Sequence, residues 1–152
     1  CTSMALQYSK GNNKGIVSLA KEALKHEVYD KEFSGISDMK YKEFANWIGN
    51  YGVRAEVYTR LNIRGLYKLL SDGNLVMVSV NPNVRGYKTA EAHQKGGHLV
   101  LVIGYDKKMK TLTLHNPSGF VSHSTQENHT ISVREFIKYY AGRGIALSTL
   151  GK

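Results

Sequence analysis

The sequence predicts an α+β fold in which N-terminal helices pack on an antiparallel β-sheet. Three observations support this class. Apolar residues in the first third of the chain recur at helical spacing. From Val53 onward, short apolar runs have the length and pattern of strands. The helical segments gather early and the strands late, which is typical of α+β proteins.

Three helices are expected in the first third of the chain. Their apolar spacing places them over residues 2–9, 15–26 and 41–50, with an irregular loop over 27–39. Gly52 follows the third helix, and glycine is a common residue just beyond a helix end. Trp47 stands at helical spacing with its apolar neighbours and is expected in the core.

The rest of the chain contains most of the strands and two further helices. In order, the pattern predicts a strand over 53–58, a helix over 62–70, a strand over 75–80, a long loop over 81–97, strands over 99–105 and 111–115, a helix from Ser132 to about Ala141, and a strand over 145–150. Asn62 and Ser132 are expected as helix N-caps, and Glu135 completes the capping-box spacing with Ser132.

The composition limits the classes of protein and site. The 152 residues fit one domain, 1–152, that is large enough to bury a core. Cys1 is the single cysteine, which excludes an intrachain disulfide and a Cys-rich zinc site. The histidines show no metal-ligand spacing, so no metal or cofactor is expected. No apolar run is long enough to span a bilayer.

The chain is basic, with 21 Lys and Arg against 12 Asp and Glu and a formal net charge of +9. Lys107, Lys108 and Lys110 form the only dense basic group. This charge is typical either of a solvated surface or of attraction to an anionic surface such as a cell wall. Nucleic acid is not expected as a partner, because the sequence contains no nucleic-acid-binding motif.

The clearest predicted unit is a β-hairpin with strands over 99–105 and 111–115. A turn centred on Lys108 pairs Val100 with Asn116, and even-numbered residues then share one face of the hairpin. His98 and Asn116 are therefore expected as neighbours at the end of this face. The same register buries the apolar residues of the face, which are Val100, Val102, Leu112 and Leu114.

Three residues have the side chains that thiol catalysis needs. Cys1 immediately precedes a predicted helix, and a helix N-terminus lowers the pKa of a thiol. A thiol also needs a base, usually His, which a third polar group orients. His98 directly follows two glycines at the start of a strand, and Asn116 follows the partner strand. These two residues fit the roles of base and orienting group.

Four segments carry a family resemblance: Cys-Thr-Ser-Met-Ala-Leu (1–6), Gly-Gly-His-Leu-Val-Leu-Val-Ile-Gly-Tyr-Asp (96–106), Leu-His-Asn-Pro-Ser-Gly (114–119) and Phe-Ile-Lys-Tyr-Tyr (136–140). They resemble, in this order, the cysteine helix, the histidine strand, the third catalytic strand and the closing helix of the peptidase C39-like family. The resemblance implies a papain-like fold and a cysteine peptidase or amidase. Cys1 would be its nucleophile, His98 its base and Asn116 its orienting residue.

Two departures from the family pattern leave alternatives open. In the family, Cys-Gly-Pro usually precedes a Thr or Ala that is followed by Ser, whereas here Cys1 directly precedes Thr2 and Ser3. The family also has an oxyanion-hole Gln a few residues before its cysteine, and that position falls upstream of Cys1. An alignment without a gap places the nucleophile upstream of Cys1, in an N-terminal segment that this domain would lack. The alternative functions are a non-catalytic binding module on the same fold, or a transpeptidase that uses an amine acceptor.

The loop over 81–97 is long for a compact domain, and long loops often carry function. The residues expected to contact a substrate are Asn81, Asn83, Tyr87, Lys88 and Gly97. The expected partner is a peptide or protein substrate. The resemblance and the basic charge imply a bacterial protein that is extracellular or wall-associated, and a cytoplasmic location is also open.

Overall fold

The computed structural model of this chain describes residues 25, 41–85, 95–116 and 128–149. The elements are, in chain order, α3 (Tyr41–Ile48), the 3₁₀ helix η2 (Gly49–Tyr51), β1 (Val53–Tyr58), α4 (Ile63–Ser71), β2 (Leu75–Val80), the 3₁₀ helix η3 (Pro82–Arg85), β3 (His98–Asp106), β4 (Thr111–His115), β5 (His129–Ser132), α5 (Val133–Ile137) and β6 (Tyr140–Thr149). Helices and an antiparallel sheet occur together, so the predicted α+β class is confirmed.

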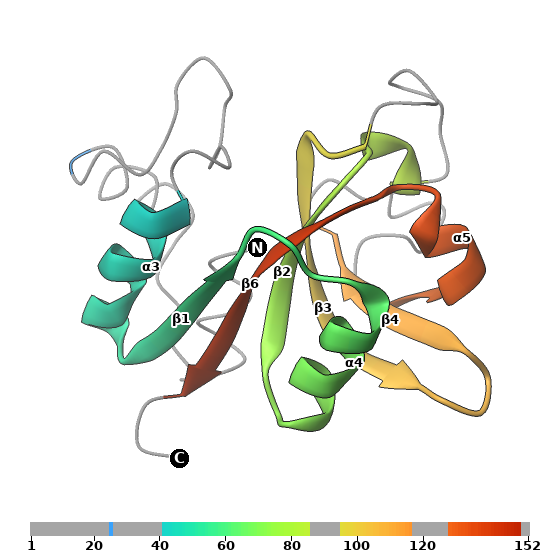
Figure 1. The fold of residues 1–152 in the computed structure, drawn as a ribbon, viewed down its shortest axis with the longest axis horizontal. Coiled ribbons are helices and arrows are strands. Elements are labelled where there is room, and N and C mark those ends of the chain that lie inside the picture. Colours follow the sequence, from blue (N-terminus) through green and yellow to red (C-terminus); the bar gives the residue numbers. More distant parts are fainter. Residues whose placement is uncertain (1–24, 26–40, 86–94, 117–127, 150–152) are drawn as a thin grey trace.

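Six strands form one antiparallel sheet in the order β1-β6-β2-β3-β4-β5 (Figure 1). The last strand in the chain, β6, lies between β1 and β2. Because neighbouring strands run in opposite directions, the end of β2, the start of β3 and the end of β4 meet at one end of the sheet. Val80 pairs there with His98, and Leu101 pairs with His115.

Apolar side chains cover both faces of the sheet. On one face, α3 packs on the strands through Tyr41, Phe44, Trp47 and Ile48. On the other face, α4 and α5 contribute Leu66 and Phe136, which are both fully buried. Alternation along the strands separates the two sets: Met77 faces α3, whereas Val76 and Val78 face α4 and α5. Trp47 is buried, as the sequence predicts.

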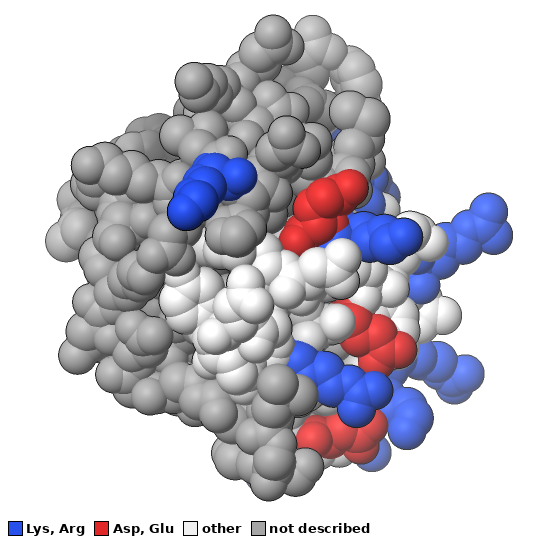
Figure 2. Space-filling model, turned by 90° about the vertical axis from the view of Figure 1, so that its left-hand side faces the viewer, with Lys and Arg blue, Asp and Glu red and all other residues white. Residues whose placement is uncertain are grey.

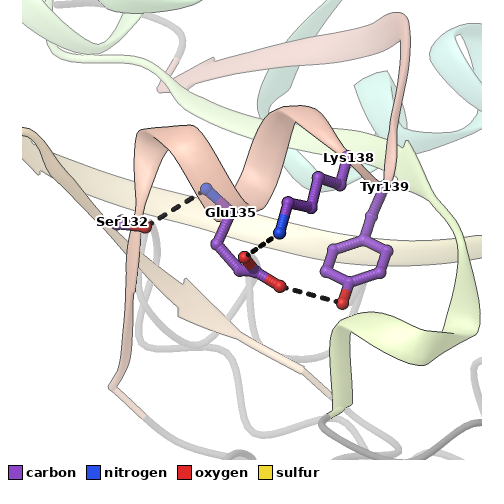
Figure 3. A network of polar contacts seen from close by, with 4 residues as sticks. All are labelled: Ser132, Glu135, Lys138 and Tyr139. Atoms are coloured by element: carbon purple, nitrogen blue, oxygen red, sulfur yellow. Dashed lines mark hydrogen bonds and ion pairs between the residues drawn. The ribbon is translucent and has the colours of Figure 1, made fainter.

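Both predicted helix N-caps are confirmed. Asn62 Oδ1 accepts a hydrogen bond from the backbone N–H of Gly65 at 2.8 Å. Ser132 Oγ accepts one from the backbone N–H of Glu135 at 3.1 Å (Figure 3). The Glu135 carboxylate in turn accepts hydrogen bonds from Lys138 Nζ at 2.8 Å and from the Tyr139 hydroxyl at 3.1 Å. These two bonds are the main reason that the pKa of Glu135 is lowered.

Several further expectations can be compared with the described residues. The helix over 41–50, the strands over 53–58, 75–80, 99–105 and 111–115, and the helix over 62–70 all occur within two residues of their predicted bounds. The helices over 2–9 and 15–26 and the loop over 27–39 lie outside the described residues, except for Lys25, which is helical. Within the described part of the chain, no helix is long and apolar enough to cross a membrane.

The C-terminal part of the fold corrects the prediction. The last helix ends at Ile137 and not near Ala141, and the last strand begins at Tyr140 and not at residue 145. Aromatic residues at 139 and 140 favour a strand, and Gly142 has a φ of 76°, which a helix does not allow. The pattern also fails to predict β5, because Ile131 is the only aliphatic residue in that four-residue strand.

Candidate active site

The register of the β3–β4 hairpin places His98 and Asn116. Near these residues, Val102 pairs with Leu114, which is the predicted register. Beyond Val102 an irregularity shifts the pairing by one residue, so Gly104 pairs with Thr113. The predicted register is therefore correct at the site end of the hairpin and wrong at the turn end.

The hairpin face that carries His98 and Asn116 is the face covered by α4 and α5. The four apolar residues expected on it, Val100, Val102, Leu112 and Leu114, are all fully buried. His98 pairs with Val80 of β2, which belongs to the same apolar cluster. The two polar residues thus extend a buried apolar face at the end of the sheet.

His98 and Asn116 interact directly, since His98 Nε2 lies 2.7 Å from Asn116 Oδ1. A carbonyl oxygen only accepts hydrogen bonds, so Nε2 carries the hydrogen and a neutral ring has its lone pair on Nδ1. Asn116 is fully buried and His98 is partly buried, and a hydrogen bond in such surroundings is stronger than one in water. The pair can therefore take up a proton at Nδ1 while Nε2–H still donates to Asn116.

Two glycines lead the chain into β3. Gly96 has a φ of 95° and Gly97 a φ of 92°, values that residues with a Cβ rarely adopt. At Gly96 a Cβ would also lie 2.7 Å from Arg143 Nη2 and 3.1 Å from Ser79 Oγ. The absence of a Cβ therefore lets side chains from β2 and β6 approach the backbone just before His98.

Asn81 directly follows β2, Asn83 lies in η3, and both are buried. Asn81 Oδ1 accepts a hydrogen bond from the backbone N–H of Asn83 at 2.7 Å, and the Asn81 N–H donates to the Tyr139 carbonyl at 2.8 Å. These bonds fix the start of the loop against the segment between α5 and β6. Contact with a substrate stays a prediction for both asparagines.

The other candidate residues divide into two groups. Gly97 is described and lies immediately before His98, where it is exposed. Cys1, Tyr87 and Lys88 lie outside the described residues, so their positions relative to His98 stay predictions. Among the described residues, no group of three or more His, Cys, Asp or Glu side chains gathers in a way that could hold a metal ion.

One residue near this end of the sheet is not predicted from the sequence. Arg143 of β6 reaches Gly96, although 47 positions separate them in the chain. An isolated Arg before a predicted strand does not by itself indicate a functional site. Only the pairing of β6 with β2, which the sequence does not specify, could have identified it.

Comparisons with known proteins place this fold among peptidase domains. A model of the Peptidase C39 like family matches residues 1–146. The peptidase domain of Streptococcus ComA, a bifunctional ABC transporter involved in a quorum sensing pathway, has a similar structure. Its TM-score is 0.59 at 18% identity, and the match covers 97% of this chain and 86% of that chain.

A second solved structure is the N-terminal peptidase C39 like domain of a toxin secretion ATP-binding protein from Vibrio parahaemolyticus. It matches with a TM-score of 0.48 at 12% identity, over 95% of this chain and 96% of that chain. A search of curated proteins finds no match. The likeness to the ComA domain extends over nearly the whole chain and shows that the two share a fold.

Proposed function

Because this chain belongs to the peptidase C39-like family, we propose that it is a cysteine peptidase or amidase that uses Cys1, His98 and Asn116. The observation that carries the proposal is the 2.7 Å hydrogen bond between His98 Nε2 and Asn116 Oδ1. This bond holds the imidazole in the tautomer that a thiol nucleophile requires, with its lone pair on Nδ1. The family and the shared fold support a peptide as the substrate.

The reaction proceeds in two halves. His98 Nδ1 takes the proton of the Cys1 thiol, and the thiolate attacks the carbonyl carbon of the peptide or amide bond. The imidazolium then gives that proton to the leaving nitrogen as the C–N bond breaks, which leaves a thioester on Cys1. In the second half, His98 takes a proton from water, and the hydroxide attacks the thioester. The C–S bond breaks, the acid leaves, and Cys1 regains its proton.

Asn116 acts in both halves without exchanging a proton. Its Oδ1 accepts from Nε2–H of the neutral ring and of the imidazolium, and the bond to the imidazolium is the stronger one. Burial of Asn116 keeps the amide in one place as the charge on His98 changes. Asn116 is thus a positioning residue that also stabilises the charged form of the base.

Alkylation of the thiol tests the assignment without knowledge of the substrate. Cys1 is the only cysteine, so each iodoacetamide adduct reports on one site. We expect fast labelling near neutral pH and slower labelling in a His98→Ala variant. His115→Ala is the matched control, because His115 lies on the other face of β4 and accepts from the Asn128 N–H at 3.1 Å. Equal rates for the unmodified protein and His98→Ala would refute the proposal.

The same experiment separates the alternative functions. If the protein is folded and Cys1 is labelled at the rate of an unperturbed thiol, the result indicates a non-catalytic binding module. If labelling is fast, incubation of peptides with an added amine separates hydrolysis from transpeptidation. Water gives a free acid as the product, whereas a transpeptidase gives the product amide of the added amine.

We also propose that the protein works outside a bacterial cell, at an anionic surface such as the cell wall. The support is its net charge of +9 and the exposed Lys107, Lys108 and Lys110 at the β3–β4 turn. Figure 2 shows Lys and Arg side chains projecting singly along one margin, with acidic side chains between them. We expect binding to cell-wall fragments at low ionic strength and release by high salt. No binding at low salt would contradict this location.

A further inference from the structure

Among the described residues, no acidic side chain forms an ion pair with the guanidinium group of Arg143. Within the described part of the chain, its side chain is only partly exposed, its Nε is buried without a hydrogen-bond partner, and it makes no ion pair. A buried donor on a charged group costs free energy that a partner normally offsets. This arrangement is typical of an arginine whose partner is a separate molecule.

An irregularity in β6 sets the position of this side chain. Val78 pairs with Gly144 and Val80 pairs with Tyr140, so three residues of β6 lie opposite the single residue Ser79. Gly142, within this bulge, has a φ of 76°, and its carbonyl accepts a hydrogen bond from the Leu61 N–H at 2.7 Å. The bulge is therefore a fixed part of the backbone, and Arg143 is its last residue.

Two polar groups from neighbouring strands converge on one glycine. Arg143 Nη2 lies 2.7 Å and Ser79 Oγ lies 3.1 Å from the point that a Cβ on Gly96 would occupy. Any other residue at this position would push the guanidinium and the hydroxyl away. Gly96 thus keeps two hydrogen-bond donors close together at the end of the sheet.

This cluster lies next to the proposed base. Only Gly97 separates Gly96 from His98, and Val80, the neighbour of Ser79, pairs with His98. Adjacent residues of β2 point to opposite faces, so the Arg143 cluster and His98 flank the start of β3 from two sides. An extended peptide that crosses this end of the sheet can present its scissile bond to His98 and a neighbouring group to Arg143.

We propose that Arg143 binds a carboxylate of the substrate and makes the enzyme selective for peptides with an acidic group near the scissile bond. A guanidinium presents paired N–H donors that match the two oxygens of a carboxylate, and the Ser79 hydroxyl adds a further donor. The carboxylate belongs to an Asp or Glu side chain or to the peptide's C-terminus. The selectivity in cleavage rests on the proposed peptidase function, whereas the binding rests on Arg143 and its neighbours.

Cleavage of paired peptide libraries tests the selectivity. The two members of each pair differ only by Asp or Asn at one scanned position, and each is made with a free and with an amidated C-terminus. We expect about a ten- to hundredfold higher kcat/KM for the acidic member at one position. Arg143→Gln should abolish this preference and Arg143→Lys should keep part of it. Arg54→Gln, which removes an exposed charge on the edge strand β1, should retain it.

Three results would overturn the proposal: no acidic preference at any position or terminus, a preference that survives Arg143→Gln, or an equal loss in Arg54→Gln. Thermal unfolding verifies that each variant is folded. If no peptide is cleaved, fluorescein-labelled members are titrated into the His98→Ala protein. Tighter binding of acidic members that depends on Arg143 supports the site and contradicts only the peptidase function. Equal affinity for the acidic and the neutral member of each pair overturns the proposed carboxylate site at Arg143.

Discussion

Replacement of Asn116 with Ala removes the acceptor that orients His98. The lost bond is 2.7 Å long, and Asn116 is fully buried. A hydrogen bond to a charged group is worth about 1.5–3 kcal/mol and one between neutral groups about 0.5–1.5 kcal/mol. The imidazolium therefore loses roughly 1–1.5 kcal/mol more than the neutral ring does. Because a titration midpoint moves one pH unit for about 1.36 kcal/mol, the expected displacement is about one pH unit.

The assay is the rate of Cys1 alkylation by iodoacetamide as a function of pH. If His98 activates Cys1 as proposed, a thiolate paired with an imidazolium keeps the rate high around neutral pH in the unmodified protein. We expect Asn116→Ala to move the alkaline end of this plateau down by about one pH unit. Asn116→Asp should move it up, because a carboxylate favours the imidazolium. The matched control is Asn74→Ala, which removes a 3.0 Å hydrogen bond to the Leu69 carbonyl and should leave the profile unchanged.

The direction of the shift decides the outcome. A folded Asn116→Ala protein with the unmodified profile would refute the orienting role of Asn116. An upward shift would refute the argument from charge stabilisation. Unfolding curves for all variants verify that the protein under test is folded.

Three further predictions concern stability and pH. Phe136→Ala should lower the free energy of unfolding by about 3–5 kcal/mol, because this α5 side chain is fully buried against the sheet, and urea denaturation measures the loss. Gly144→Ala should cost about 1–3 kcal/mol, since its Cβ would lie 2.6 Å from a backbone carbonyl oxygen of β2, whereas Gly49→Ala, with nothing within 4 Å, should not destabilise the protein. A thermal unfolding series in which both variants behave alike would contradict this. The hydrogen bond from Lys138 helps to lower the pKa of Glu135 below its ordinary 4.5, so the carboxylate stabilises the fold above that pH and loses this effect as the pH falls through the lowered value. Glu135→Gln should therefore cost less than about 1 kcal/mol at neutral pH, and its unfolding curve should converge with that of the unmodified protein in acid.

The elements near the site follow from the sequence because burial constrains them. The register at the site end of the hairpin buries Val100, Val102 and Leu114, and the same register brings His98 to Asn116. Beyond Val102 the constraint weakens, since Ile103 and Gly104 are only partly buried. The pairing can shift there at little cost, and the sequence gives no indication of the shift.

The other differences depend on contacts between distant parts of the chain. Tyr140 joins the sheet because β2, some sixty residues earlier, provides an edge for it to pair with. The same pairing creates the bulge opposite Ser79 and places Arg143 at Gly96. Local patterns describe helices, strands and tight hairpins, but they contain no information on which distant strands become neighbours.

The central position of β6 has a consequence for the order in which the protein forms during synthesis. Among the strands that the structure describes, β1 pairs only with β6, and β2 has β6 on one of its two sides. While the ribosome makes the chain, both strands therefore present unpaired backbone edges until residues 140–149 emerge. The sheet closes only when this segment arrives. A nascent chain should consequently acquire the complete fold of this family only after residues 140–149 have left the ribosome.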